Sequence, residues 1–107
     1  MRKRAIELNA RDIASLDKVL HEPARLSVVA CLAVVQHADF VFLQSQTGMT
    51  GGNLSAHLRK LEEAGYLTIE KSFQDSRPKT TLALTKSGRS ALDAYLKTLS
   101  ALLAAIA

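Results

Sequence analysis

Cysteine, tryptophan and long hydrophobic runs are almost or wholly missing from this sequence of 107 residues. The single cysteine, Cys31, excludes an internal disulfide and a cysteine-based zinc knuckle. The longest purely apolar stretches, Val28–Val35 and Ala101–Ala107, fall far short of the ~20 residues that a membrane-spanning helix needs. Polar residues between positions 7 and 12 interrupt the apolar run that a secretory signal requires. We therefore expect a cytoplasmic protein with no membrane partner.

Signatures of catalysis and of bound cofactors are missing as well. No glycine-rich phosphate loop follows a predicted strand, no nucleophile motif occurs, and no carboxylate pair stands out by its spacing. His57 has no second potential ligand at the spacing that metal sites use. The sequence thus predicts a protein that is not an enzyme and that needs no metal and no other cofactor.

Positive charge is present in modest excess and is unevenly distributed. Lysine and arginine number 14 against 10 acidic residues, and 48% of the residues are hydrophobic, which fits one globular domain. Between Arg59 and Arg89, seven basic residues are found with four acidic ones. A basic excess favours an anionic partner, most commonly nucleic acid, although a solvated surface rich in Lys and Arg has the same composition.

Helical periodicity dominates the first half of the chain. Apolar spacing predicts a helix over 11–20, and Pro23 then begins a second helix that runs to about Gln36. The second helix is apolar nearly all round, which is typical of a buried central helix. A third helix is predicted to begin at Asp39, which can cap it, and to end at Gly48. The residues expected to face the core include Phe40, Phe42, Leu43 and, much later, Phe73.

The fourth helix follows a three-residue turn, Thr47–Met49, that contains a glycine. Thr50 is a good N-cap, so the helix is predicted over Gly51–Ala64, where a following glycine can stop it. Two helices joined by so short a turn are the signature of a helix-turn-helix. At about 100° per residue one face is apolar and the opposite face is small or polar. The apolar stripe is Leu54, Leu58 and Leu61.

Beyond this motif the period changes to that of strands. Residues 66–71 and 80–85 alternate, and the polar stretch 72–79 between them is predicted to be a loop, which makes an antiparallel hairpin. Thr85 then caps a last helix, 86–106, whose apolar residues recur about every 3.5 positions. Such a seam packs on a helix of a second copy or on its own domain, and we favour the second copy. The predicted dimerisation residues are Leu92, Tyr95, Leu96, Leu99, Leu103 and Ile106.

The order of these elements predicts a winged helix-turn-helix, an α+β fold that is mainly α, with a two-stranded antiparallel wing and a long C-terminal helix. The stretch Gly51–Phe73, GGNLSAHLRKLEEAGYLTIEKSF, resembles the recognition helix and first wing strand of winged-helix regulators of the MarR and ArsR groups. Upstream, Leu20–Leu32, LHEPARLSVVACL, is similar to their buried second helix. The resemblance covers about 16–95 and points to the small, single-domain winged helix DNA-binding domain group. It implies DNA binding by a transcriptional regulator, usually as a homodimer.

The predicted recognition helix, about 51–64, has suitable chemistry for the major groove of duplex DNA. Small residues at its start let the backbone approach phosphates, Asn53 can read adenine, and Arg59 or Lys60 can read guanine or hold phosphate. The wing, 71–80, is expected to reach the backbone or the minor groove. From this chemistry and the family pattern, the predicted DNA-binding residues are Thr50, Gly51, Gly52, Asn53, Ser55, Ala56, His57, Arg59, Lys60, Lys71, Arg77 and Lys79.

The sequence departs from its relatives in two respects. It lacks the Cys-x-Cys pair that many ArsR-type metal sensors carry, and the ligand pocket of larger MarR proteins cannot be carried over, so any small-molecule effector stays unknown. We expect a single domain over 1–107, with a core at about 13–85 and a dimerisation helix at 86–107. The alternative is a winged-helix module that binds protein instead of DNA, which would expose apolar anchors on the helix at 51–64.

Three further side chains have simpler predicted roles. Cys31 lies in the most apolar helix and is expected to be a buried, inert thiol. His37 is expected at the surface, and His21 at the end of a helix.

Overall fold

The computed structural model describes residues 10–107, which form five helices and one three-stranded antiparallel sheet. This is the winged helix-turn-helix that the sequence predicts, with α4 and α5 as the two helices of the motif. Within these residues no helix combines the length and apolar character needed to cross a membrane. In chain order the elements are α2 (Ala10–Ala14), α3 (Pro23–Val35), β1 (His37–Asp39), α4 (Phe40–Thr47), α5 (Gly51–Glu63), β2 (Leu67–Gln74), β3 (Arg77–Leu84) and α6 (Lys86–Ile106).

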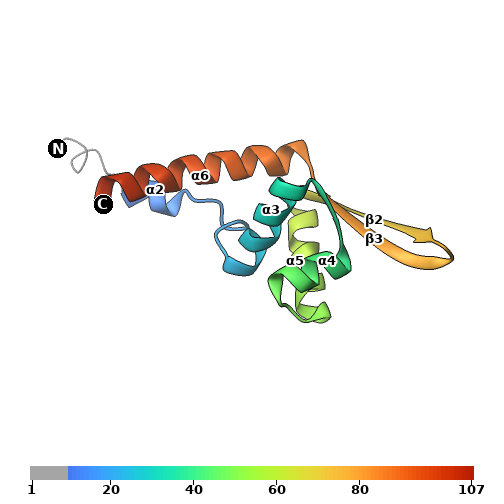
Figure 1. The fold of residues 1–107 in the computed structure, drawn as a ribbon. Coiled ribbons are helices and arrows are strands. Elements are labelled where there is room, and N and C mark those ends of the chain that lie inside the picture. Colours follow the sequence, from blue (N-terminus) through green and yellow to red (C-terminus); the bar gives the residue numbers. More distant parts are fainter. Residues whose placement is uncertain (1–9) are drawn as a thin grey trace.

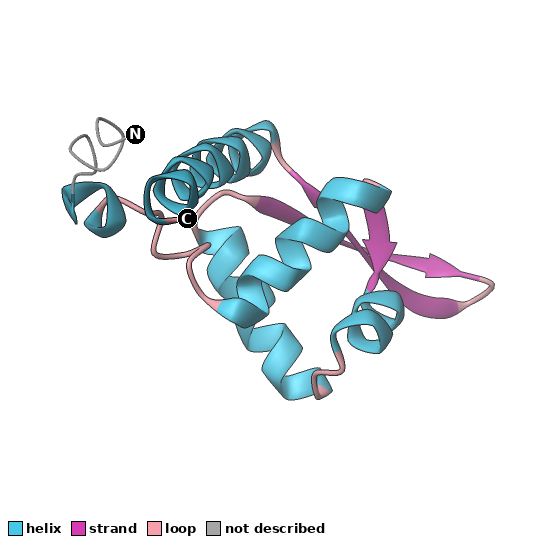
Figure 2. Ribbon diagram, turned by 60° about the vertical axis from the view of Figure 1, so that its left-hand side comes forward, coloured by secondary structure: helices cyan, strands magenta, loops and turns pink. Residues whose placement is uncertain are grey.

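Two projections extend from a central group formed by α3, α4 and α5 (Figure 1). The hairpin of β2 and β3 reaches out at one end, and α6 runs away toward the other end, where α2 lies beside it. The described residues measure 62 × 25 × 21 Å along their principal axes. Figure 2 shows, from a second direction, that the hairpin extends well beyond the helices.

The helix starts are set by side-chain caps, and the sequence predicts three of them, at Asp39, Thr50 and Thr85. Glu22 accepts from the N–H of Arg25 at 2.8 Å, and Pro23 occupies the first turn of α3, where its missing N–H is not needed. The carboxylate of Asp39 caps α4 in the same way at 2.8 Å. The hydroxyls of Thr50 and Thr85 cap α5 and α6 at 3.2 and 2.9 Å. Each cap satisfies one backbone donor that the first helical turn leaves without a partner.

The first predicted helix is much shorter than expected. α2 ends at Ala14, and turns replace the helix predicted over 15–20. The carboxylate of Asp17 accepts from the N–H groups of Val19 and Leu20 at 2.8 and 3.1 Å, a local turn that competes with the helix. Leu20 is nevertheless buried in the core. The apolar spacing therefore predicted its burial correctly but predicted the wrong secondary structure.

The sheet differs from the predicted two-stranded wing in two ways. Residues 37–39 form an additional strand, β1, which pairs with residues 81–83 of β3 and gives the order β1-β3-β2. The predicted loop at 72–79 is wrong, because β2 and β3 pair continuously out to Gln74 and Arg77. Only Asp75 and Ser76 form the turn, with φ values of +53° and +64°. Positive φ at both positions is the pattern of a tight two-residue hairpin turn.

One continuous core joins the helices to the base of the sheet. Val29 and Leu32 of α3 and Leu67 and Leu82 of the sheet are at most 2% exposed. Leu92 of α6 is buried against the same cluster. The core is built almost entirely of aliphatic side chains, and its buried members include no polar or charged residue among those described.

The aromatic residues were only partly assigned correctly. Leu43 is buried as expected and Phe40 packs against the core. Phe42, however, is 38% exposed, and Phe73 is 77% exposed because the hairpin carries it beyond the helices. Cys31, predicted to be buried, is half-buried.

The wing and α6 meet at a close backbone approach. A Cβ atom at Gly88 would lie 2.0 Å from the carbonyl oxygen of Tyr66, so this first turn of α6 has room only for glycine. The N–H of Thr85 donates to the same carbonyl at 3.0 Å, and the Thr85 hydroxyl donates to Gly65 O at 2.6 Å. These contacts fix the start of α6 on the segment between α5 and β2.

Side-chain hydrogen bonds tie the turn region at 15–22 to the rest of the fold. The Tyr66 hydroxyl donates to the Asp17 carboxylate, which together with burial raises the pKa of Tyr66 to about 12. His21 lies in the turn before α3, and its Nδ1 is hydrogen-bonded to the Tyr95 hydroxyl of α6 at 2.8 Å.

Candidate nucleic-acid interface

The turn between α4 and α5 sets the position of the predicted recognition helix. Gly48 has a φ of +72°, a left-handed conformation that favours glycine, and its N–H donates to Gln44 O at 2.9 Å. The Thr47 hydroxyl donates to Leu43 O at 2.7 Å and accepts from the N–H of Met49 at 3.4 Å. The chain therefore changes direction within a few residues, and α5 begins immediately after the turn.

The two faces of α5 differ in exposure as predicted. Leu54, Leu58 and Leu61 are at most 2% exposed and hold α5 in the core. The predicted DNA-binding residues of α5 lie on the rest of the helix surface. Gly52, Asn53, Ala56, Arg59 and Lys60 are exposed, whereas Gly51, Ser55 and His57 are half-buried.

The N-terminal turn of α5 presents its backbone to open space. A Cβ atom at Gly52 would have no heavy atom within 4 Å, whereas one at Gly51 would be in ordinary contact with Gln44 and Phe40. Thr50 is exposed, but its hydroxyl oxygen already caps the helix by accepting from Asn53 N–H. N–H groups at a helix start carry partial positive charge and bind anions well. This end of α5 can therefore accept a phosphate at close range.

His57 is turned toward the start of α3. Its Nδ1 lies 3.3 Å from Nη1 of Arg25 and 3.8 Å from a carboxylate oxygen of Glu22. Arg25 is held in turn by a hydrogen bond from its Nε to Val19 O at 2.7 Å. One ring nitrogen of His57 is thus directed into the protein. The side chain is 20% exposed, less than a residue at the centre of the exposed face would be.

A groove separates α5 from the base of the wing. Ser55, Arg59 and Glu62 line it on the helix side, and Lys71 and Thr80 line it on the strand side. Lys71 lies within β2. Both signs of charge are present, with two cations and one carboxylate. The floor of the groove is apolar and is made by Phe40, Leu58 and Ile69.

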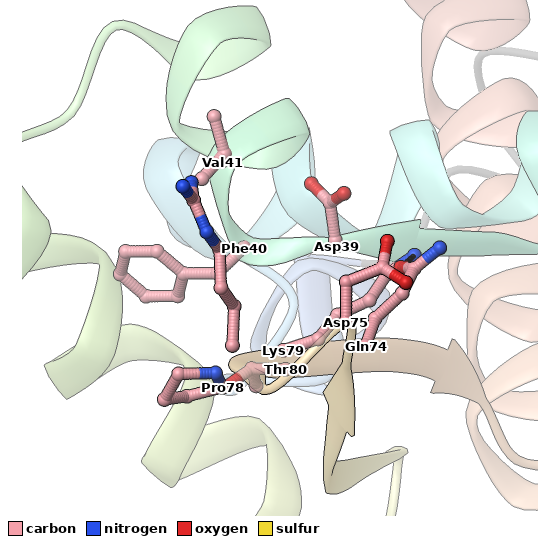
Figure 3. Close-up of a pocket in the computed structure, with 9 residues that line it drawn as sticks. Asp39, Phe40, Val41, Gln74, Asp75, Pro78, Lys79 and Thr80 are labelled. Carbon is pink, nitrogen blue, oxygen red and sulfur yellow. Dashed lines mark hydrogen bonds between the residues drawn. The ribbon is translucent and has the colours of Figure 1, made fainter.

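A second cleft lies between the start of α4 and the outer part of the wing (Figure 3). Arg77 is exposed there, and Lys79 is half-buried, with its Nζ donating to Gln74 Oε1 at 2.9 Å. The carboxylates of Asp39 and Asp75 line the same cleft. The cationic groups of the wing are therefore balanced locally by acidic ones, and the net positive character of the wing is modest.

Thr80 and Ile69 are groove residues that the sequence analysis did not single out. Both lie within the strands predicted at 66–71 and 80–85, but no local pattern in the sequence places those strands beside α5.

The predicted dimerisation residues divide into two groups. Leu92 and Tyr95 are 4% exposed and are buried within this chain, and Leu99 packs partly against the same core. By contrast, Leu96, Leu103 and Ile106 are 48%, 55% and 72% exposed. These three residues lie between the middle and the C-terminal end of α6, the helix on which α2 packs.

A family model, a relative in sequence and several solved structures resemble this chain. The family model of the winged helix DNA-binding domain matches residues 24–103. An uncharacterized protein of Methanocaldococcus jannaschii is 34% identical over 79 residues, which cover 74% of this chain and 86% of that protein. A transcriptional regulator homologue of Pyrococcus horikoshii superposes with a TM-score of 0.84 at 28% identity, over 90% of this chain and 97% of the other.

More distant solved structures share the fold. A MarR-like transcriptional regulator of Thermotoga maritima is 17% identical, with a TM-score of 0.61 over 98% of this chain and 71% of the other. At this identity the likeness concerns the fold alone. The match of the family model over most of the chain and the relative at 34% identity are stronger evidence. This chain therefore belongs to the winged helix DNA-binding domain family.

Proposed function

We propose that this protein binds duplex DNA sequence-specifically as a homodimer and regulates transcription. The observation that carries the proposal is the exposed polar face of α5, where Asn53, Ala56 and Lys60 are open to solvent while the leucine stripe is buried. α5 has 13 residues and is about 20 Å long, and a helix of this kind fits the major groove of B-DNA.

Individual residues of α5 have distinct roles in this proposal. Asn53 reads an adenine through its side-chain amide, and Arg59 and Lys60 read guanine or hold phosphates. The open backbone at Gly52 receives a phosphate at the helix start. His57 has Nδ1 directed at Arg25, so it contributes through its other ring nitrogen or by positioning the helix.

The wing supplies contacts that do not depend on sequence. Lys71 and Arg77 are exposed and Lys79 is half-buried. By the register of the hairpin, Arg77 and Lys79 share one face of the wing and Lys71 lies on the other, so both faces offer cations. Cations of this kind contact phosphates or the edge of the minor groove, and they position the recognition helix without reading bases.

The second copy packs on the C-terminal part of α6. Leu96, Leu103 and Ile106 are the exposed members of the 3.5-residue repeat, and half-buried Leu99 lies between them in the seam. Leu92 and Tyr95 fix α6 to its own domain and so contribute to the dimer only by orienting the helix. Two recognition helices brought together in this way require a two-fold symmetric DNA site.

The alternative function, a module that binds protein, would need exposed apolar anchors on α5, and α5 has none. None of the 13 residues of α5 is a large hydrophobic side chain with substantial exposure. Protein interfaces are usually centred on buried aromatic or aliphatic anchors. We likewise infer that the protein is not an enzyme, in keeping with its family.

Selection of bound sequences from a pool of random duplexes tests the proposal. We expect enrichment of a short palindrome, because two-fold related recognition helices bind half-sites centred about one helical turn, ~34 Å, or a multiple of it apart. The control is Asn53→Ala, which should change or erase the enriched bases. A pool that shows no enrichment after repeated rounds would contradict sequence-specific binding, and a single unpaired half-site would contradict the dimer.

A further inference from the structure

The wing carries an aromatic side chain that neither the core nor the proposed phosphate contacts use. Phe73 is 77% exposed and lies one residue from the end of β2, next to the hairpin turn. Its position was predicted to belong to the core, so its exposure is a finding of the structure.

Phe73 has an apolar partner across the hairpin. Its register partner on β3 is Pro78, which is also exposed. Directly opposed residues of an antiparallel pair have their side chains on the same face. A proline is tolerated at this point because β1 pairs only with residues 81–83, so the outer edge of β3 is open beside Pro78. The two residues make a small apolar tip on one face of the wing.

This face continues the proposed DNA surface. Side chains alternate along a strand, so Lys71 and Ile69 lie on the same face of β2 as Phe73. Both line the groove beside α5 together with Arg59. Glu70 lies on the opposite face of the strand by the same alternation. On the face that carries Phe73, Lys71 is therefore the only charged residue contributed by β2. A positive charge there suits an anionic partner such as DNA.

We propose that Phe73, backed by Pro78, enters the minor groove next to the site of α5 and wedges between base pairs, bending the duplex. Apolar side chains, including Phe and Pro, kink DNA in this way in proteins that bind the minor groove. The inference rests on the proposed function, because it needs a bound duplex. The wedge adds sequence specificity without hydrogen bonds to bases, because it favours duplexes in which an easily unstacked base step lies beside the site bound by α5.

The test uses the full chain and the duplex enriched in the selection described above. Donor and acceptor dyes at the two duplex ends report bending, and titration reports affinity. We expect the wild type to bend the duplex, and Phe73→Ala to lower affinity about tenfold and to straighten the complex. Phe73→Leu keeps an apolar wedge and should retain most of the bend. Val34→Ala removes a side chain of comparable exposure, 82%, from α3 and should change neither quantity.

The outcomes separate this inference from the proposed function. If no duplex is bound by the wild type, both are overturned. If the wild type binds but Phe73→Ala matches it in affinity and bend, only the wedge is overturned. An affinity loss with an unchanged bend would also contradict the wedge. The salt dependence should be the same for wild type and Phe73→Ala, because no charge is removed.

Discussion

The two projections of this molecule, the wing and the far part of α6, are both long and exposed but differ in chemistry. The outer wing is polar, with Lys71, Arg77 and one aromatic side chain, whereas α6 exposes Leu96 and Leu103. Polar strands suit a hydrated, charged surface such as DNA. Exposed leucines at 3.5-residue spacing suit another helix. Under the proposed function, each end therefore has its own partner, duplex DNA at the wing and a second copy of the chain at α6.

The largest effect is expected at the apolar end. Replacing both Leu96 and Leu103 by glutamate would place carboxylates in the proposed dimer seam, at a cost of about 5 kcal/mol or more of association free energy. Sedimentation should then show a monomer of 11.6 kDa instead of a species of twice that mass. Both leucines are about half exposed, so the fold should persist.

Lys97→Glu is the control for this variant, because Lys97 is an exposed neighbour on the same helix that lies outside the repeat. It should leave the mass unchanged. If the double glutamate variant has the same mass as the wild type, α6 is not the dimer seam, and the proposed difference between the two ends fails.

The next largest effect is expected where the two projections meet. Gly88→Ala would force a Cβ atom against the Tyr66 carbonyl, so the start of α6 or the base of the wing must shift. We expect a loss of about 3 kcal/mol in the free energy of unfolding, measured with urea. Gly52→Ala, in an open position of α5, should stay within about 1 kcal/mol of wild type. An equal loss of stability in the two variants would mean that the contact between Gly88 and Tyr66 adapts to a methyl group and does not fix α6 on the wing.

At the polar end, removal of a single cation should have a moderate and uniform effect. Arg77→Ala should weaken binding to selected and random duplexes equally and reduce the slope of log affinity against log salt by about 0.9. Titrations at several salt concentrations measure this. A loss confined to the selected duplex would instead make Arg77 a base-reading residue.

The smallest effect is expected in the body between the two ends. The pKa of Tyr66 is raised from 10.0 to about 12 by its hydrogen bond to Asp17, so the folded protein keeps this proton more tightly than the unfolded chain. Stability from this contact is complete below pH 10 and is lost as the pH rises toward 12. The difference in stability between wild type and Tyr66→Phe should therefore shrink over that range. A constant difference would contradict the shift.

Much of the fold could be predicted because its signals are local. Asp39, Thr50 and Thr85 precede helices with the chemistry that caps require, and the structure has helices beginning at each of them. The leucine spacing of α5 gave its buried face, and hence the exposed face that carries the candidate site.

The misassigned segments are those in which tertiary context decides the outcome. The outer wing has no core on either face, so its strands lack the apolar alternation that identifies a strand, and Phe73 was taken for a core residue. The helix expected at 11–20 stops early because the carboxylate of Asp17 bonds to the backbone, a competition that apolar spacing does not reveal. Strand β1 has only three residues and is specified by its pairing with β3.

The most direct test of the account is the ratio of affinities for the selected duplex and a scrambled duplex of the same composition, measured for the wild type and Asn53→Ala. If α5 reads bases, the variant should lose ~1–3 kcal/mol on the selected duplex and almost nothing on the scrambled one, so that the ratio falls. Equal affinity of the wild type for the two duplexes, or an equal loss on both in the variant, would contradict base reading by this helix.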